Sequence, residues 1–345
     1  MTIFDLMQAR ELAAYWIELL QDEEPYPCEE LFPADKKRGL SLSWIKGAKG
    51  LPVVLNTSAF DAAAVPRGRI GFSKLSTEMP YFKESTYIDE ELRQELNMVL
   101  ETGNAAYIDA VMIRVFDDEL RLLRGARASR ERMRMMALTT GIIAMANNGQ
   151  TFTYNYGVTH KGNAAVSWSN MENADPIEDI RAAKEEIEQE TGSKITRAMC
   201  DGQTWRYLRN NKKIQNDIYA RQSHIGAVTN NQLREYIADQ LDGLVIAVND
   251  KRYVDESGVT QKFMPEDTFV MFPSGPLGKT WFGTTPSESD LMSSGVANVS
   301  IVETGVAITT IKKADPVQVE TIVSMICLPS FEQADNVYII DTNAS

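Results

Sequence analysis

Residues 104–146 read NAAYIDAVMIRVFDDELRLLRGARASRERMRMMALTTGIIAMA, and their apolar positions largely keep the three- and four-residue spacing of one helix face. One helix over this range would be roughly 60 Å long, at about 1.5 Å per residue. A compact globule of 345 residues would measure only about 50 Å across. The sequence therefore predicts an elongated, flattened molecule built along one helix, which Gly125 and Gly141 can interrupt.

Downstream of this helix, strands and helices alternate as in an α/β domain. Asp175 and Pro176 are a helix cap and a first helical residue, and Gly192 is a typical helix stop. Further helices are expected at 203–210 and 230–240, a hairpin at 253–263, and strands at 151–156, 166–168, 194–200, 244–248 and 268–272. The tail returns to strands at 306–311, 317–327 and 337–340. We expect the tail to rejoin the strands around Tyr154, so that the α/β block is an insertion into a discontinuous β domain.

Upstream of the long helix, residues 40–85 are punctuated by glycine and proline. Val53–Leu55 and Ile70–Phe72 are expected to be strands on either side of a turn at Pro66, Arg67 and Gly68. Such a hairpin has too few large apolar residues to bury a face of its own, and a two-stranded ribbon is marginal in isolation. We therefore expect it to rest on another surface, with its tip on an adjacent subunit.

Charge is unevenly distributed along the chain. Residues 1–35 carry nine acidic side chains against Arg10 alone, and their prolines favour a helical start followed by an extended arm. The long helix carries an arginine band with Glu131 as its local acid: Arg121, Arg124, Arg127, Arg130, Arg132 and Arg134. This band is either a solvated helix face or a docking strip. We hypothesise that the acidic arm, through Glu23, Glu24 and Glu29, pairs with Arg124, Arg127 and Arg130 of its own or a neighbouring subunit.

The composition excludes several classes of protein. With 43% hydrophobic and 24% charged residues, the chain is typical of soluble globular proteins. Its net charge of −13 argues against a dedicated nucleic-acid binder, because phosphate backbones would repel it. No apolar run is long enough for a membrane span or a secretory signal. Cys28, Cys200 and Cys327 are scattered and odd in number, which indicates a reducing cytoplasm rather than a disulfide framework.

Motifs for catalysis are scarce. Phosphate-binding glycine loops, zinc-binding histidine pairs and paired-cysteine motifs are all missing from the sequence, so no metal and no cofactor are expected. We interpret His160 and His224 as ordinary surface or loop histidines. One candidate remains: Cys200 ends an expected strand immediately before a helix, where an α/β enzyme places a nucleophile. The alternative function is therefore a cytoplasmic α/β hydrolytic enzyme with Cys200 as nucleophile, and the competing interpretation of Cys200 is a buried core residue.

Three short stretches, in this order, resemble a known family. They are Glu24-Pro25-Tyr26-Pro27 in the arm, Asp175-Pro176-Ile177-Glu178-Asp179-Ile180 at the helix start, and Tyr253-Val254 followed by Gly258-Val259 and Phe263-Met264-Pro265-Glu266-Asp267-Thr268. With the order of arm, ribbon, long helix and α/β block, they resemble the major capsid proteins of tailed bacteriophages, and more closely the lambda-type major capsid protein E family. The resemblance extends over nearly the whole chain at low identity.

The resemblance implies an α+β fold of the Hong Kong 97-like type and a non-enzymatic shell protein. It divides the chain into an N-terminal arm (1–39), an extended loop (40–88) and a spine helix region (89–149). These are followed by a discontinuous peripheral domain (150–174 with 306–345) and an axial domain (175–305). Copies would assemble as pentamers and hexamers into an icosahedral shell that encloses double-stranded DNA without sequence-specific binding.

The resemblance also implies partners and a location. These are other copies of the chain, a portal, a decoration protein in some relatives, and a scaffolding protein. The scaffolding protein is expected to be separate, because no long scaffolding segment precedes the arm. The expected location is the virion, after assembly in the cytoplasm of the bacterial host, with no membrane partner.

Overall fold

The computed structural model describes residues 23–46, 73–88, 105–147, 150–221, 227–292, 297–314 and 317–343, together with Glu90, Gln94 and Met98. Two compact units divide the chain. The first unit comprises residues 1–42, 76–133 and 279–330, and the second comprises 43–75, 134–278 and 331–345. Among the helices of the described ranges, none is long and apolar enough to cross a membrane.

The first unit is built on a six-stranded sheet. Its strands are β1 (Ala34–Lys36), β4 (Tyr81–Tyr87), β13 (Lys279–Phe282), β14 (Asn298–Val302), β15 (Val306–Ala314) and β16 (Val317–Ser330). The order is β1-β13-β16-β15-β14, and β4 also pairs with β16. β1 and β13 are parallel, and the other pairs are antiparallel.

β16 organises this sheet. Residues 317–325 pair with β15, residues 320–326 pair with β4, and residues 327–330 pair with β13. Its residues from Thr321 to Ser330 are all buried, which requires that both faces of this part of the sheet are covered. A short π-helix, Ser287–Leu291, lies in the connection between β13 and β14.

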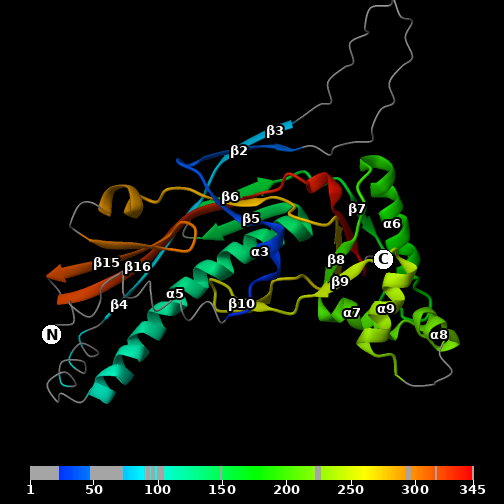
Figure 1. Ribbon diagram of the computed structural model, residues 1–345, viewed down its shortest axis with the longest axis horizontal. Coiled ribbons are helices and arrows are strands. Elements are labelled where there is room, and N and C mark those ends of the chain that lie inside the picture. Colours follow the sequence, from blue (N-terminus) through cyan, green and yellow to red (C-terminus); the bar gives the residue numbers. More distant parts are fainter. Residues whose placement is uncertain are drawn as a thin grey trace, which may run out of the picture. The chain divides into compact units, whose positions relative to one another are not determined.

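Two helices of very different length lie wholly or partly in the first unit. α3 (Pro27–Leu31) follows Tyr26, places Pro27 in its first turn and buries Cys28 and Leu31. The expected extended arm is therefore interrupted by a short helix, and the expected helical start lies outside the described residues. α5 (Ala105–Thr140) is 36 residues long, about 54 Å by its rise per residue, and is the longest helix in Figure 1.

α5 ends earlier than the sequence predicted. Gly141 has φ 72°, the left-handed conformation that commonly terminates helices, and residues 142–146 are strand rather than helix. β5 (Ile142–Asn147) pairs with β6 (Gln150–Asn155). A Cβ on Gly141 would lie 2.7 Å from Val158 Cγ2, so both the conformation and the packing require glycine. Gly125, the other expected interruption, lies within the helix.

The second unit contains a five-stranded sheet in the order β7-β17-β12-β8-β9. These strands are β7 (Lys161–Asn163), β8 (Arg197–Cys200), β9 (Val245–Val248), β12 (Thr268–Phe272) and β17 (Tyr338–Asp341). Four helices pack against this sheet: α6 (Pro176–Thr191), α7 (Gly202–Asn210), α8 (Lys212–Arg221) and α9 (Asn230–Gln240) (Figure 1). Alternate strand residues, including Cys200, Ile246 and Phe269, join the apolar core under these helices.

Local signals in this unit were predicted well. The α6 N-cap is Asp175, whose side chain accepts from Glu178 N, and Gly192 is a left-handed C-cap at φ 70°. The expected hairpin is β10 (Arg252–Val254) paired with β11 (Thr260–Lys262). α8 was not predicted, because Ile214 and Ile218 are its only large aliphatic side chains in a polar sequence. Asn211 starts it by accepting from Ile214 N at 3.1 Å.

Non-local pairing was predicted less well. β17 pairs with β7 and β12, whereas β6 pairs with β5, so the tail does not rejoin the strands around Tyr154. Residues 166–168 are not a strand, since Trp168 lies buried in a turn region and donates to Asp179 Oδ2 at 2.8 Å.

The two units also divide the chain differently from the expected domains. Residues 279–305 group with β15 and β16, because β13 is hydrogen-bonded to the end of β16. Residues 331–345 group with the α/β block, because β17 is an inner strand of its sheet.

The structure describes the base of the ribbon that the sequence predicts. β2 (Ser41–Lys46) and β3 (Ser73–Glu78) form a two-stranded sheet. Leu42 and Trp44 are buried, and the Trp44 ring lies 5.7 Å from the Tyr156 ring, so the base is held by its own chain. The expected strands at 53–55 and 70–72 and the turn at Pro66, Arg67 and Gly68 lie outside the described residues.

Candidate functional site: an arginine–glutamate cluster

The N-terminal arm and α5 meet through charged side chains within the first unit. Arg124 Nε lies 2.7 Å from Glu23 Oε1, and Arg127 Nη1 lies 3.3 Å from Glu23 Oε2. Glu29 Oε1 is 3.9 Å from Arg127 Nη2. The structure therefore brings Glu23 and Glu29 to the arginine band of the same chain, while Glu24 is exposed. We call these pairs, with Glu303 and Arg130 described next, the arm–helix cluster.

Glu303 supplies the remaining acid of this cluster. Its Oε1 lies 3.4 Å from Arg127 Nε and its Oε2 lies 2.5 Å from Arg130 Nη2. Glu303 occupies the turn between β14 and β15 with φ 55°, a conformation that costs a non-glycine residue about 1 kcal/mol or more. Arg130 also stacks over the Phe282 ring at 5.6 Å. Sequence reasoning missed Glu303, because a single acid in a turn gives no charge pattern.

The cluster is much less exposed than a solvated helix face. The side chains of Arg127 and Arg130 are 10% and 6% exposed, against 52% for Arg124. Buried guanidinium groups are strongly destabilising unless they are paired, so the acids of the arm and of the β14–β15 turn are required for α5 to pack here. The solvated-face interpretation is wrong for Arg127, Arg130 and Arg134, which are all buried.

A second contact fixes α3 to α5. Glu131 is fully buried, and its Oε1 accepts from the backbone N–H of Cys28 at 3.1 Å. The neighbouring Tyr26 is half-buried, and burial together with the Glu131 charge raises the pKa of its hydroxyl, so Tyr26 stays neutral. The helix thus positions the arm through a hydrogen bond as well as through ion pairs.

Cys200, the candidate nucleophile, does not have the environment of one. It is fully buried, and burial, aided by the charges of Asp201 and Asp250, raises the pKa of its thiol well above the ordinary value. The next residue, Asp201, caps α7 by accepting from Thr204 N at 2.9 Å and Gln203 N at 3.1 Å. The strand–helix junction therefore has a structural role, and the core interpretation of Cys200 agrees with its burial.

The other titratable candidates are also explained by packing. His160 is a loop residue as expected, but it is buried rather than on the surface, between Glu186 and Glu190 of α6 and the ring of Tyr338. His224 lies outside the described residues. Within the described part of the chain, no group of three or more metal-ligating side chains could hold an ion.

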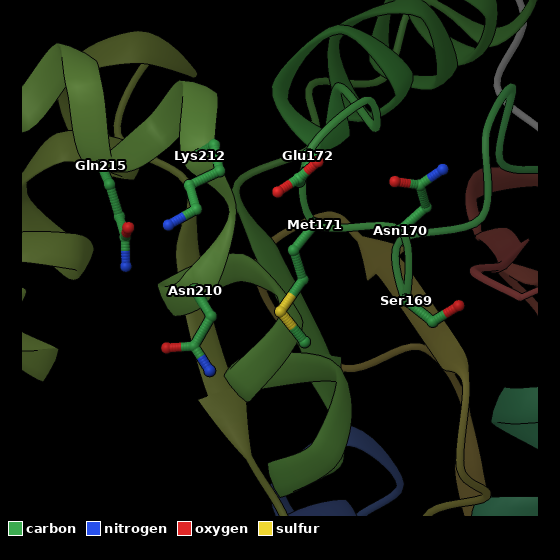
Figure 2. Close-up of a pocket in the computed structure, with 7 residues that line it drawn as sticks. All are labelled: Ser169, Asn170, Met171, Glu172, Asn210, Lys212 and Gln215. Carbon is green, nitrogen blue, oxygen red and sulfur yellow. The ribbon is translucent and has the colours of Figure 1, made fainter.

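One surface hollow of about 560 Å³ lies in the second unit (Figure 2). It is open and is lined by Ser169, Asn170, Met171, Glu172, Asn210, Lys212 and Gln215. The Lys212 backbone N–H donates to Met171 O at 2.8 Å, which joins the loop to the start of α8. Its mixed lining and open form do not resemble a ligand cavity, which is typically enclosed and mostly apolar.

Comparisons with solved structures define the fold. The chain is similar to a protein described as the capsid protein of a prophage in E. coli CFT073, with a TM-score of 0.62, 14% identity, and coverage of 97% of this chain and 99% of that one. A phage-related protein from Bordetella bronchiseptica RB50 follows, with a TM-score of 0.58, 12% identity and 97% of each chain covered. The capsid of cyanophage A-1(L) gives a TM-score of 0.50 and 12% identity, covering 97% of this chain and 93% of that one.

These matches identify the fold as the Hong Kong 97-like fold of phage capsid proteins. The model of the family described as phage major capsid protein E matches residues 31–342, and the chain belongs to that family. Among curated proteins, none matches the chain. The chain is therefore a phage major capsid protein, a structural component of the virion that associates with copies of itself.

Proposed function

We propose that this chain assembles as pentamers and hexamers into the icosahedral shell that encloses packaged double-stranded DNA. The observation that carries the proposal is the extent of the capsid match, which covers 97% of the chain and therefore both units. The net charge of −13 supports it, because an acidic wall does not bind the DNA phosphates that it encloses. The burial of Cys200 supports a non-enzymatic role.

Each segment has a proposed place in the shell. Residues 40–88 are the extended loop that lies over a neighbouring subunit, and residues 89–149 are the spine helix region. Most of the remaining first unit is the peripheral domain, and the α/β part of the second unit is the axial domain near the capsomer centre. The two-stranded β2–β3 ribbon supports the loop assignment, because an extended loop in this segment starts and ends as a ribbon.

The proposal includes partners besides the chain itself. They are a scaffolding protein, a portal and, as in some relatives, a decoration protein. Assembly takes place in the cytoplasm of the bacterial host, before DNA fills the shell.

Negative-stain electron microscopy of the purified full chain tests the proposal. We expect closed shells or rings of five and six subunits. Small particles of uniform size, with no rings at any concentration, would contradict it. Replacing residues 53–71 with a short Gly-Ser linker should leave a soluble, folded protein that no longer closes shells. Normal shells from that deletion would show that the ribbon does not hold subunits together.

The non-enzymatic part of the proposal has its own test. Cys200→Ala and His224→Ala should both assemble and package as the parent does, with at most a modest loss of stability for the trimmed core position. A hydrolytic activity of the parent that either substitution abolishes would instead favour the enzyme.

A further inference from the structure

The C-terminal half of α6 carries acidic side chains on two sides. Glu186 and Glu190 lie beside His160, whereas Glu185 and Glu188 lie on another side of the helix, which we call the acidic face. Residues 185–190 include Glu185, Glu186, Glu188 and Glu190 and no Lys or Arg. Within the described ranges, no Lys or Arg forms an ion pair with any of the four; the nearby Lys184 is buried and donates instead to Leu241 O at 2.7 Å. Acidic groups at a helix C-terminus oppose the helix dipole, so folding alone does not favour this placement.

A basic segment of equal and opposite charge lies in the same unit. Residues 202–216, spanning α7 and the start of α8, carry Arg206, Arg209, Lys212 and Lys213 and no acid. Arg206, Lys212 and Lys213 are exposed. Of the four, only Lys213 has an ion pair in the described part of the chain, to Asp175 Oδ2 at 3.2 Å.

Among the described residues, no ion pair joins the acidic face to the basic segment within one chain. The Lys213–Asp175 pair places the start of α8 beside the N-cap of α6. Glu185 and Glu190 lie ten and fifteen residues further along α6, or about 15 and 22 Å by the rise per residue. That separation is well beyond the screening length of about 8 Å at physiological salt.

We propose that the acidic face of α6 in one subunit docks on the basic α7–α8 segment of a second copy of this chain. Charge complementarity identifies the occupant, since the acidic face of Glu185 and Glu188 is opposite in charge to the basic α7–α8 segment. Because the two surfaces differ, the contact is heterologous, and repeating it around an axis gives a ring where the rotation closes, as the proposed pentamers and hexamers require. This inference rests on the proposed function and names the surfaces through which neighbouring α/β units meet.

Two charge-reversal variants of the full chain test the contact. The acid variant is Glu185→Lys with Glu188→Lys, which spares the glutamates beside His160. The base variant is Arg206→Glu with Lys212→Glu. Each should lower the yield of shells, counted by electron microscopy, by about tenfold, because like charges then face each other. All four substitutions in one chain should restore the parent yield.

Co-expression of the acid variant with the base variant gives a sharper result. Alternating copies restore attraction at every contact, and six positions can alternate whereas five cannot. We therefore expect hexameric rings without closed shells. The matched control for the acid variant, Glu235→Lys with Asp290→Lys, makes the same change in net charge as that variant at exposed positions elsewhere and should assemble normally. Circular dichroism melts should show that every variant is folded.

The outcomes separate the inference from the proposed function. If the variant with all four substitutions assembles as poorly as the acid variant or the base variant, the acidic face serves a different partner and the inference is wrong. Shells formed by the parent would still leave the proposed function intact. If the control loses shells to the same extent, net charge rather than this contact is responsible, and the inference is also wrong. If the parent forms neither rings nor shells, the proposed function fails and the inference with it.

Discussion

The two units build their interiors differently. The interior of the first unit contains charged groups in its middle: Arg127, Arg130 and Glu131 are all less than 10% exposed. The second unit has an apolar core around Trp168 and Phe269, and two of its buried charges, Asp201 and Lys184, serve at helix ends. The first interior therefore combines apolar packing with directional contacts between charged groups, whereas apolar packing dominates the core around Trp168. Substitutions should affect the two in different ways.

The largest effect should come from the apolar core of the second unit. Trp168 is fully buried against Phe269, with ring centroids 5.4 Å apart. Trp168→Ala should lower the free energy of unfolding by about 3–5 kcal/mol in urea titrations, because it leaves a large cavity. Trp168→Phe keeps most of the ring and should cost clearly less, although Asp179 loses its indole donor. Equal losses for both substitutions would mean that packing does not dominate this interior.

An intermediate effect is expected in the first unit. Glu303→Gln removes the charge that pairs with Arg127 and Arg130, and should cost about 1–3 kcal/mol in the same titrations. The matched control is Glu320→Gln, since Glu320 pairs with the more exposed Lys313 at 2.7 Å. That control should cost only about 0.2–1 kcal/mol. A Glu303 effect no larger than the control would contradict the structural role of the buried charges.

A capping charge in the second unit should respond to pH. Burial by itself would raise the pKa of Asp201, but hydrogen bonds from Thr204 and from Lys262 and Gln203 hold it below the ordinary value. Its stabilising contribution is therefore present above the unfolded pKa of about 3.9 and is lost as pH falls through the folded pKa. Asp201→Asn should cost about 1 kcal/mol at pH 7 and progressively less below pH of about 4. A cost that does not change with pH would contradict the ionised cap.

The smallest effect on stability should come from the exposed end of the arm–helix cluster. Arg124→Glu should cost about 0.2–1 kcal/mol at low salt and less at high salt, because the Arg124 side chain is half exposed. Adding Glu23→Lys should restore part of the stability in thermal melts and part of the shell yield. Reversing Arg127 or Arg130 would be a poorer test, since both are buried beside Glu303. No recovery in the double variant would argue against the arm pairing.

Sequence reasoning succeeded where the signal is local. Asp175, Pro176 and Gly192 fix both ends of α6, because caps act on the residues beside them. It failed where partners are distant: nothing in residues 337–340 shows that β17 pairs with β7 rather than β6. The sequence predicted part of the arm–helix cluster, since the opposite charges of the arm and α5 indicated that these two segments could pair. The backbone turn at Glu303, which completes the pairing, depends on the tertiary fold.

The pairing of β16 has a mechanical consequence. Its residues 320–325 are hydrogen-bonded to β15 on one edge and to β4 on the other, and these bonds run perpendicular to the strand. Tension applied along β16 therefore loads both ladders in shear, and the bonds must yield together rather than one after another. If hydrogen bonds on one edge of β16 are broken locally, the ladder on the opposite edge still holds the strand in the sheet.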